Sequence, residues 1–252
     1  MLLVANWKLN GNKLLLNNFI NKLYENKKII NNKIILAPPI IYLDYLNNIL
    51  LKKYNINNVY SSSQNVDLNF EGPYTGEISI YMLKEIGVSY VILGHSERRI
   101  IHKESNKNII KKFILVKSNN LIPILCIGEN NNDYINKKSL LKCINQIKEF
   151  IKYGGIKIFY NSIIAYEPIW SIGTNVNASI DHIEYIICSI LKYLNKIDKN
   201  ISNNIKFLYG GSVSIDNIDI FLNKYFINGL LIGKSSLDIN NFLYMINKIN
   251  KI

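Results

Sequence analysis

The sequence predicts an α/β protein folded as a single (β/α)8 barrel domain over residues 1–252. Three observations point to this fold. Eight short apolar runs recur at intervals of roughly 25 to 40 residues, which is the spacing of repeated βα units. Amphipathic segments fill the intervals between the runs. No Pro/Ser-rich linker or change of composition divides the chain, and its length suits one large domain.

Each apolar run has the length and composition of a strand that is buried on both faces, as in a parallel sheet. In chain order the expected strands are "LLVAN" (2–6), "IILA" (34–37), "NVYSSS" (58–63), "YVILG" (90–94), "IPILCIG" (122–128), "SIIAY" (162–166), "KFLYG" (206–210) and "GLLIG" (229–233).

The segments between the strands carry apolar residues at three- and four-residue spacing, which predicts helices on the outside. The clearest are residues 15–28, 104–117 and 182–196. Eight such units close most naturally into a barrel, whose active site lies at the carboxyl ends of the strands. The alternative is an open doubly wound sheet. That fold favours a GxGxxG turn after its first strand, and "NWKLNG" is not one.

Composition indicates a soluble cytoplasmic protein. The sequence lacks an apolar run long enough to cross a bilayer and a basic, signal-like start. Its three cysteines include no CxxC pair, so we expect reduced, buried thiols. The net charge of +12 comes from lysines scattered over every segment and is weak evidence for nucleic-acid binding.

Polar residues that follow the expected strands would meet at one rim of the barrel. They include a candidate base (Glu167), an imidazole (His95), a fixed cation (Lys8) and an amide (Asn6). A lone histidine is often structural. The position of His95 at a strand end, after a glycine, favours a functional role. Pro168 disfavours a helix running through Glu167.

Two glycine turns, "YGGSV" (209–213) and "LIGKSSL" (231–237), run directly into helical patterns. Such turns aim backbone N–H groups and a helix N-terminus at one point, which favours a phosphate. The alternative is that the glycines only permit tight turns. The segment "PIWSIGT" (168–174) resembles a mobile lid, in which Gly173 can bring its N–H onto a ligand.

Other polar residues receive structural interpretations or no role. We expect Glu97, Arg98 and Arg99 to form an ion-pair network, because the arginine fork suits carboxylates. His102 and His182 fall within helical patterns away from the rim, and we assign them no role. No His/Asp/Glu cluster has metal-ligand spacing, so we expect no metal and no cofactor.

The motifs "ANWKLNG", "GHSERR", "AYEPIWSIGT", "YGGSV" and "LIGKSSL", in this order and spacing, closely resemble the triosephosphate isomerase family. Further matches at "QNV", "EGPYTGEIS" and "PILCIGE" extend the resemblance over essentially the whole chain. Several of these motifs are highly specific. The resemblance implies a TIM barrel that interconverts dihydroxyacetone phosphate and D-glyceraldehyde 3-phosphate, in glycolysis and gluconeogenesis.

The resemblance also implies roles for residues. The family is a known example of tuned acid–base catalysis with loop closure. Glu167 would remove a carbon-bound proton to give an enediol(ate), and neutral His95 would polarise the carbonyl and shuttle protons. Lys8 and Asn6 would stabilise the developing oxyanion. The phosphate would be held by backbone N–H groups, those of Gly173, Ser212, Gly233 and Lys234.

The family is usually a homodimer in which the loop around Thr75 reaches the neighbouring subunit, and this chain keeps that loop. Two departures stand out. Asn175 replaces a usual lid glycine, and Val176 and Asn177 alter the second hinge of the lid. Lys234 stands where a second glycine is common, and its ammonium group either attracts phosphate or points to solvent.

Two other functions remain open from the residues alone. Another phosphosugar barrel enzyme would share the phosphate turns, although the set of His95, Lys8 and Glu167 disfavours it. A basic nucleic-acid-binding protein on a barrel scaffold is suggested only by the charge, and its binding would fall steeply with salt.

Overall fold

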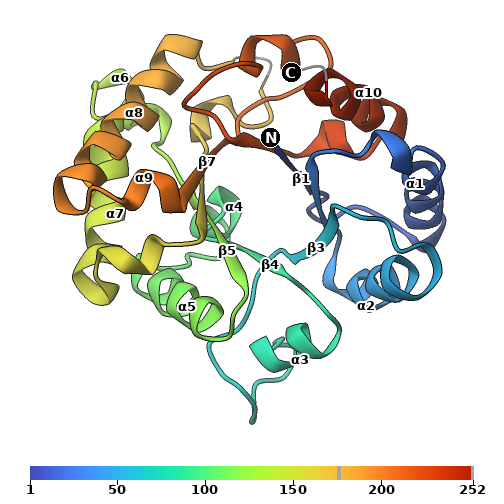
Figure 1. The fold of residues 1–252 in the computed structure, drawn as a ribbon. Coiled ribbons are helices and arrows are strands. Elements are labelled where there is room, and N and C mark those ends of the chain that lie inside the picture. The colour runs from blue at the N-terminus through green and yellow to red at the C-terminus, as the bar shows by residue number, and fades with distance from the viewer. Residues whose placement is uncertain (175–176, 251–252) are drawn as a thin grey trace. The chain divides into compact units, whose positions relative to one another are not determined.

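The computed structural model describes residues 1–174 and 177–250, with side chains omitted at 50–52. Eight parallel strands follow one another in chain order and form a closed barrel (Figure 1). The strands are β1 (Leu2–Asn6), β2 (Lys33–Ala37), β3 (Val59–Ser63), β4 (Tyr90–Leu93), β5 (Ile122–Ile127), β6 (Ser162–Tyr166), β7 (Ile205–Tyr209) and β8 (Gly229–Ile232). The predicted barrel is confirmed, and the open doubly wound sheet is excluded.

The predicted strand limits agree with the structure to within one residue at each end. The sequence prediction ran one residue too far at four glycines, 94, 128, 210 and 233, which lie just beyond their strands. Gly94 shows the physical reason, because its φ of 66° lies in the left-handed region and turns the chain out of the sheet. These glycines therefore mark where the chain leaves the barrel and the rim begins.

Helices follow the strands, and short polar side chains begin several of them. They are α1 (Lys13–Glu25), α2 (Leu43–Asn48), α3 (Ile80–Glu85), α4 (Ser96–Ile100), α5 (Asn106–Ser118), α6 (Asn131–Ile135), α7 (Ser139–Gly154), α8 (Ile180–Ile197), α9 (Ile201–Asn204) and α10 (Ile239–Asn250). The side chains of Asn12, Ser105 and Ser179 accept backbone N–H groups at the starts of α1, α5 and α8.

The chain divides into two compact units. The first comprises Met1–Val91, Val213–Lys224 and Gly229–Ile252, and the second comprises Ile92–Ser212 and Tyr225–Asn228. In the first unit, β1 pairs with both β2 and β8, and Phe19 packs its ring on Trp7 and Phe242. In the second unit, β6 pairs with both β5 and β7. Each unit therefore has its own segment of the sheet.

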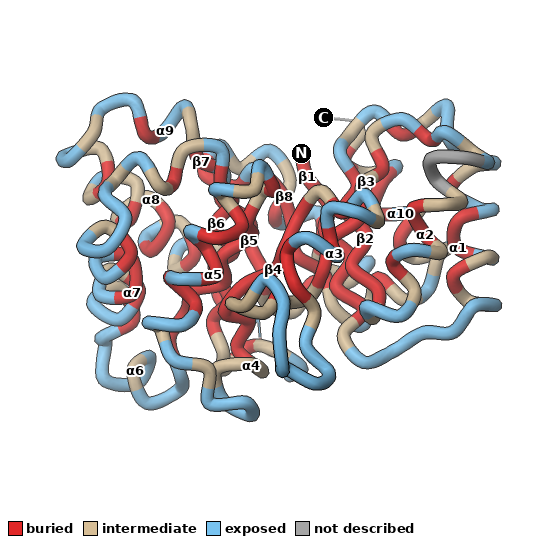
Figure 2. The backbone as a smooth tube through the Cα atoms, turned by 90° about the horizontal axis from the view of Figure 1, so that it is seen from below, coloured by how far each residue is buried: buried red, intermediate tan, exposed pale blue. Residues whose placement is uncertain are grey.

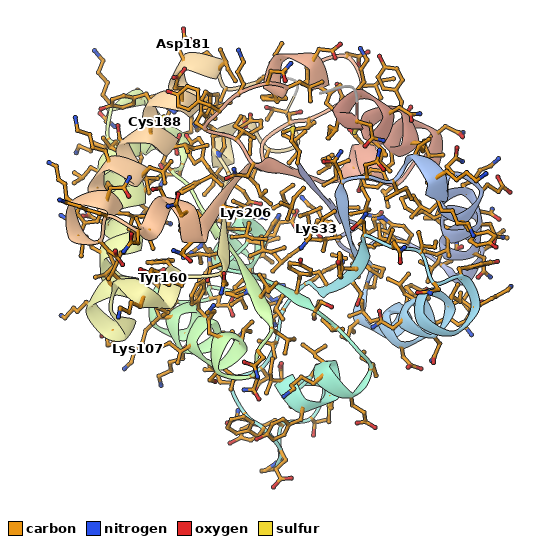
Figure 3. The ribbon with its side chains drawn as sticks, viewed as in Figure 1. Lys33, Lys107, Tyr160, Asp181, Cys188 and Lys206 are labelled. Carbon is orange, nitrogen blue, oxygen red and sulfur yellow. The ribbon has the colours of Figure 1, made fainter. Side chains whose placement is uncertain are left out.

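Burial follows the pattern that parallel strands require. The strands are buried along most of their length, while the helices alternate between buried and exposed residues (Figure 2). Lysines occupy exposed positions on different elements, such as Lys33 in β2, Lys107 in α5 and Lys206 in β7 (Figure 3). None of the described helices combines the length and the apolar character that a membrane span requires.

Candidate active site

Glu167 lies directly after β6 and is held by the backbone on either side. Its N–H donates to the carbonyl of Ile127 at 2.8 Å, and the N–H of Ile169 donates to the carbonyl of Glu129 at 3.0 Å. Glu167 is only 2% exposed. The sheet ladder thus continues past the end of the strand and fixes the Cα of this carboxylate relative to β5.

Gly128, the residue after β5, makes this close approach possible. A Cβ added at residue 128 would lie 1.8 Å from the carbonyl oxygen of Glu167, and real Cβ atoms do not come so near to other atoms. The Gly128 N–H donates to the side chain of Gln146 at 3.1 Å, which holds the glycine in place. A residue with a side chain at this position would displace the candidate base.

His95 follows β4 and begins the short helix α4. Its Nδ1 accepts the backbone N–H of Glu97 at 3.2 Å. A carboxylate oxygen of Glu97 lies 3.6 Å from the same Nδ1, beyond hydrogen-bonding distance, so the backbone donor makes the closer contact. Because Nδ1 acts as an acceptor, the proton of the imidazole is assigned to Nε2.

The two predicted acid–base residues meet in the second unit. His95 Nε2 and Glu167 Oε1 are 3.4 Å apart, and the Ser96 N–H lies 3.4 Å from Glu167 Oε2. Both residues are buried, with exposed fractions of 6% for His95 and 2% for Glu167. A buried carboxylate is costly unless polar groups face it. The imidazole N–H and the first amide of α4 supply those groups.

The arginine pair behaves differently from the expected ion-pair network. Arg98 contacts the carboxylate of Glu104, with Nε 3.3 Å from Oε2. Arg99 instead donates to two backbone carbonyls, that of Gly94 at 2.6 Å and that of Cys126 at 3.1 Å. The prediction is therefore right for Arg98 and wrong for Arg99. Burial lowers the pKa of the Arg99 guanidinium, and several donors of its fork are used to tie the loop before His95 to the end of β5.

Lys8 and Asn6 lie together in the first unit. The Asn6 side-chain oxygen accepts the N–H of Lys8 at 3.1 Å, and Gln64 donates to the Lys8 carbonyl at 2.9 Å. Lys8 has a φ of 54°, a left-handed conformation that is uncommon for a lysine and often occurs at functional sites. Its side chain passes Gly233, where an added Cβ would lie 3.6 Å from Lys8 Cε. The structure thus brings together three of the predicted site residues in this unit.

The predicted phosphate-binding residues lie on turns in both units. Gly173 is exposed, has a φ of 69° and has open space where a Cβ would stand. Gly233 precedes a 3-10 turn, Lys234–Ser236, in which the Ser236 hydroxyl donates to the Gly233 carbonyl at 2.7 Å. Lys234 is exposed, and Ser212 is partly buried.

One expectation about these turns is wrong. "LIGKSSL" does lead directly into a short 3-10 turn, but "YGGSV" is followed by an irregular turn before the 3-10 helix Ile218–Phe221. The cause is local, because the Asn217 side chain accepts the Ser214 N–H at 2.9 Å and the Ser214 hydroxyl accepts the Asp216 N–H at 3.3 Å. Asn177 of the predicted lid is exposed, whereas Asn175 and Val176 lie outside the described residues.

A buried polar cluster beside Glu167 was missed by the sequence analysis. Glu129, the second residue after β5, has no exposed surface and accepts hydrogen bonds from the Tyr166 hydroxyl and the Trp170 indole. His182, which we expected away from the rim, lies 3.0 Å from that hydroxyl and 3.5 Å from a Glu129 oxygen. The signals were present in the acidic residue of "CIGE" and in Trp170, but a helical pattern hid the inward position of His182.

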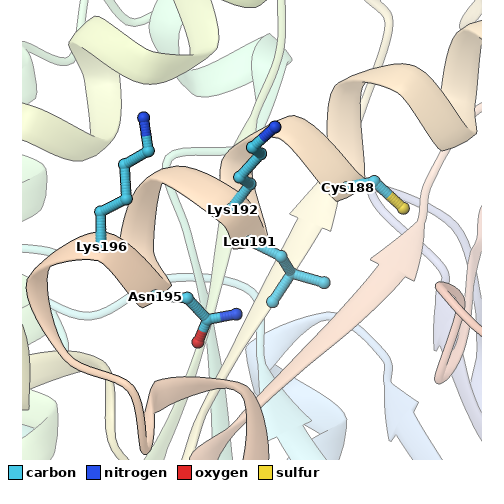
Figure 4. Close-up of a pocket in the computed structure, with 5 residues that line it drawn as sticks. All are labelled: Cys188, Leu191, Lys192, Asn195 and Lys196. Atoms are coloured by element: carbon cyan, nitrogen blue, oxygen red, sulfur yellow. The ribbon is translucent and has the colours of Figure 1, made fainter.

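A separate shallow pocket of about 450 Å³ runs along α8 (Figure 4). Its lining is Cys188, Leu191, Lys192, Asn195 and Lys196, all from one helix. These five side chains include neither a carboxylate nor an imidazole, so they do not repeat the chemistry of the site at Glu167. Among residues 1–174 and 177–250, no group of three or more His, Cys, Asp or Glu side chains is placed to hold a metal ion.

Comparison with known proteins agrees with the motifs. The family model described as triosephosphate isomerase matches residues 1–249. Curated triosephosphate isomerases are similar over nearly their whole length. The protein from Blochmanniella floridana is 46% identical, with 97% of this chain and 94% of the relative covered.

The triosephosphate isomerase of Wigglesworthia glossinidia brevipalpis is 45% identical over 99% of this chain and 96% of its own. That of Buchnera aphidicola subsp. Acyrthosiphon pisum is 44% identical over 97% and 95%. A closed eight-stranded barrel, a buried carboxylate facing an imidazole and these matches lead to one conclusion. The chain belongs to the triosephosphate isomerase family.

Proposed function

We propose that this protein is an enzyme that interconverts dihydroxyacetone phosphate and D-glyceraldehyde 3-phosphate, the triose-phosphate step of glycolysis and gluconeogenesis. The single observation that carries the proposal is the buried pair of Glu167 and His95, whose Oε1 and Nε2 atoms are 3.4 Å apart. The reaction moves one proton between adjacent carbons and others between the attached oxygens. It therefore needs one base at carbon and one donor at oxygen, both shielded from water.

In this proposal Glu167 is the base. Its carboxylate takes the proton from the carbon next to the carbonyl, and the electron pair left behind forms the enediol(ate). The carboxylate then returns a proton to the neighbouring carbon, which completes the exchange. The backbone bonds on both sides of Glu167 and the glycine at 128 hold the base in place, and positional precision of this kind is worth orders of magnitude in rate.

His95 acts at the oxygens. With Nδ1 occupied by the Glu97 amide, the Nε2–H faces the site and donates to the substrate carbonyl oxygen. A neutral imidazole can give this proton to one oxygen and accept one from the other, which moves protons between the two oxygens of the enediol. Lys8 and Asn6 are proposed to stabilise the oxyanion, Lys8 by its charge and Asn6 by its amide.

The phosphate is proposed to bind backbone N–H groups, those of Gly173, Ser212, Gly233 and Lys234. Turns rich in glycine suit this role because a phosphate can approach the main chain without meeting a side chain. The open space at Gly173 and the passage of Lys8 beside Gly233 support the proposal. No metal and no cofactor is assigned a step, because the reaction is an internal transfer of protons without net oxidation.

We also propose that the protein acts in the cytoplasm as a homodimer. The segment around Thr75 and the helix after it expose large apolar side chains, among them Tyr74, Tyr81 and Met82, which are about half exposed. Phe70 and Tyr81 stack with ring centroids 4.9 Å apart, which stiffens this surface. Exposed apolar groups gathered on one segment are typical of an interface. None of the three cysteines forms a disulfide bond, which agrees with a reducing compartment.

The proposed activity is tested by a coupled assay of glyceraldehyde 3-phosphate isomerisation with the purified protein. Glu167→Asp, which withdraws the carboxylate by one methylene, and His95→Gln are measured beside it. Rapid turnover by the wild type with large losses in both variants supports the proposal. A folded wild-type protein without activity on either triose phosphate would refute it.

A further inference from the structure

Glu129 joins the two stretches of chain on either side of Glu167. Its carboxylate accepts the Tyr166 hydroxyl at 3.0 and 3.1 Å and the Trp170 indole N–H at 2.8 Å. Tyr166 immediately precedes the candidate base, and Trp170 follows it by three residues. A single buried carboxylate therefore ties both ends of the segment that carries Glu167.

His182 is the third residue of α8, where the Ser179 hydroxyl accepts its backbone N–H at 3.2 Å. Its imidazole lies beside the Glu129 carboxylate. Nε2 lies 3.0 Å from the Tyr166 hydroxyl and 3.5 Å from Glu129 Oε1. The His182 and Tyr134 rings pack at right angles with centroids 5.3 Å apart, and 20% of the His182 side chain is exposed.

The hydroxyl of Tyr166 has one proton and two neighbours that compete for it. If the proton went to His182 Nε2, Glu129 would lose a donor in a fully buried position, which is costly for a carboxylate. If Nε2 carries a proton of its own, it donates to the Tyr166 oxygen, and the hydroxyl remains free to donate to Glu129. Burial and the neighbouring carboxylate also raise the pKa of Tyr166, so the hydroxyl keeps its proton.

We propose that His182 is a positioning residue for Glu167. His182 acts by donating a hydrogen bond from Nε2 to the Tyr166 hydroxyl, which directs that hydroxyl onto Glu129. The proposal rests on the isomerase function proposed above. Without the imidazole donor, the Tyr166 hydroxyl can also point away from Glu129. The hydrogen bond between Glu129 and the Trp170 indole then weakens, and the Glu167 carboxylate is no longer fixed in one position. Hydrogen-bond networks in buried sites reinforce one another in this way.

The test compares three variants at residue 182 and beside it. His182→Gln keeps an N–H donor on a side chain of similar reach, and His182→Phe keeps a ring without a donor. Asp181→Asn changes the preceding residue of the same helix, which is exposed and points outward (Figure 3). We expect His182→Phe to lower kcat by about tenfold with KM changed less than about twofold, because misplacement of a catalytic group affects the chemical step. His182→Gln is expected to recover most of kcat, and Asp181→Asn to match the wild type.

A second readout is independent of activity. In a Trp7→Phe background, Trp170 is the sole tryptophan, and its indole is bonded to Glu129 and stacked on Tyr134 at 4.0 Å. We expect the emission maximum of Trp170 to shift in His182→Phe and to return in His182→Gln. In a Tyr166→Phe background, which lacks the hydroxyl, His182→Phe is expected to cause no further shift.

These outcomes separate the inference from the proposed function. The wild type could prove inactive while the Trp170 emission still shifts in His182→Phe and returns in His182→Gln. That result would refute the isomerase proposal and leave the link from His182 to Trp170 in place. Equal losses of kcat in His182→Gln and His182→Phe would show that His182 acts only through packing and would overturn the inference. An unchanged kcat and an unchanged Trp170 emission in His182→Phe would also overturn it.

Discussion

The backbone of Glu167 rests directly against Gly128, where an added Cβ would lie 1.8 Å from the Glu167 carbonyl oxygen. This contact joins the end of β5 to the residue after β6. It explains why a glycine stands at this point of the rim. A position that serves only as a turn would tolerate a small side chain, whereas this one excludes even a methyl group.

Gly128→Ala should therefore damage both activity and stability. The methyl group must push the Glu167 backbone aside, and we expect kcat to fall by about 10²-fold with a loss of about 1–3 kcal/mol in the free energy of unfolding. Gly155→Ala is the matched control, because Gly155 has a φ of 70° and open space around it, far along the chain from the rim. It should lose stability and keep kcat. The coupled assay measures kcat, and urea unfolding measures the free energy of unfolding. A fully active Gly128→Ala enzyme would contradict the role assigned to the contact between Gly128 and the Glu167 backbone.

The tautomer of His95 is a second prediction. Because the Glu97 N–H donates to Nδ1, nitrogen NMR of the labelled protein at neutral pH should show a protonated Nε2 and an unprotonated Nδ1. His95→Gln should lower kcat by about 10²-fold or more, since an amide donates to the carbonyl oxygen but cannot shuttle protons. A spectrum with the proton on Nδ1 would remove the donor role from Nε2.

Lys234 offers a test of main-chain phosphate binding. Its side chain is exposed, and the proposal assigns the contact to its backbone N–H. Lys234→Gln should therefore change KM by less than about threefold, the scale of an exposed charge interaction. Lys8→Gln, which removes the cation proposed to face the oxyanion, should instead reduce kcat strongly. An increase in KM far above this range for Lys234→Gln would show that the ammonium itself binds phosphate.

Stability should fall at alkaline pH, in part through Cys143. Burial, followed by the Glu129 carboxylate, raises the pKa of the Cys143 thiol well above its ordinary value. In the unfolded chain a thiol loses its proton near pH 8.5. Above that pH the folded state holds a proton that the unfolded state has released, so the free energy of unfolding decreases as pH rises toward the folded pKa.

The measurement is Tm between pH 7 and 10 for the wild type and for Cys143→Val, which is apolar, close in size and has no titrating group. The variant should show a shallower decline over this range. In the folded wild type, iodoacetamide should modify the partly exposed Cys188 before the buried Cys126 and Cys143. Identical pH profiles for the two proteins would show that Cys143 titrates alike in the folded and unfolded states.

The proposed dimer is tested by introducing a negative charge into the exposed aromatic surface around Thr75. Tyr74 and Tyr153 are both about half exposed, but Tyr153 lies on α7, in a different part of the chain. Tyr74→Asp should shift sedimentation toward the monomer, because a buried unpaired charge is costly in an interface. Tyr153→Asp should leave the dimer intact. A wild-type protein that sediments as a monomer at micromolar concentration would contradict the proposal.

The eight strands and the positions of Glu167 and His95 could be predicted because runs of buried residues and strand-end motifs are local signals. The Glu129 cluster could not, since it depends on how the first turn of α8 faces the end of β5, and helical periodicity does not show which neighbour a partly exposed residue meets. The bonding of Arg99 was missed for a similar reason. Residue type suggested a carboxylate partner, whereas the fold presents carbonyls at the end of β5 and after β4.

Exchange of the carbon-bound proton of dihydroxyacetone phosphate for solvent deuterium tests the central claim most directly, because it observes the step assigned to Glu167 itself. We predict that the wild type incorporates deuterium at the carbon next to the carbonyl, followed by proton NMR, and that Glu167→Gln is slower by about 10² to 10⁴-fold with its fold intact. Exchange by Glu167→Gln at the wild-type rate would show that another group removes the proton.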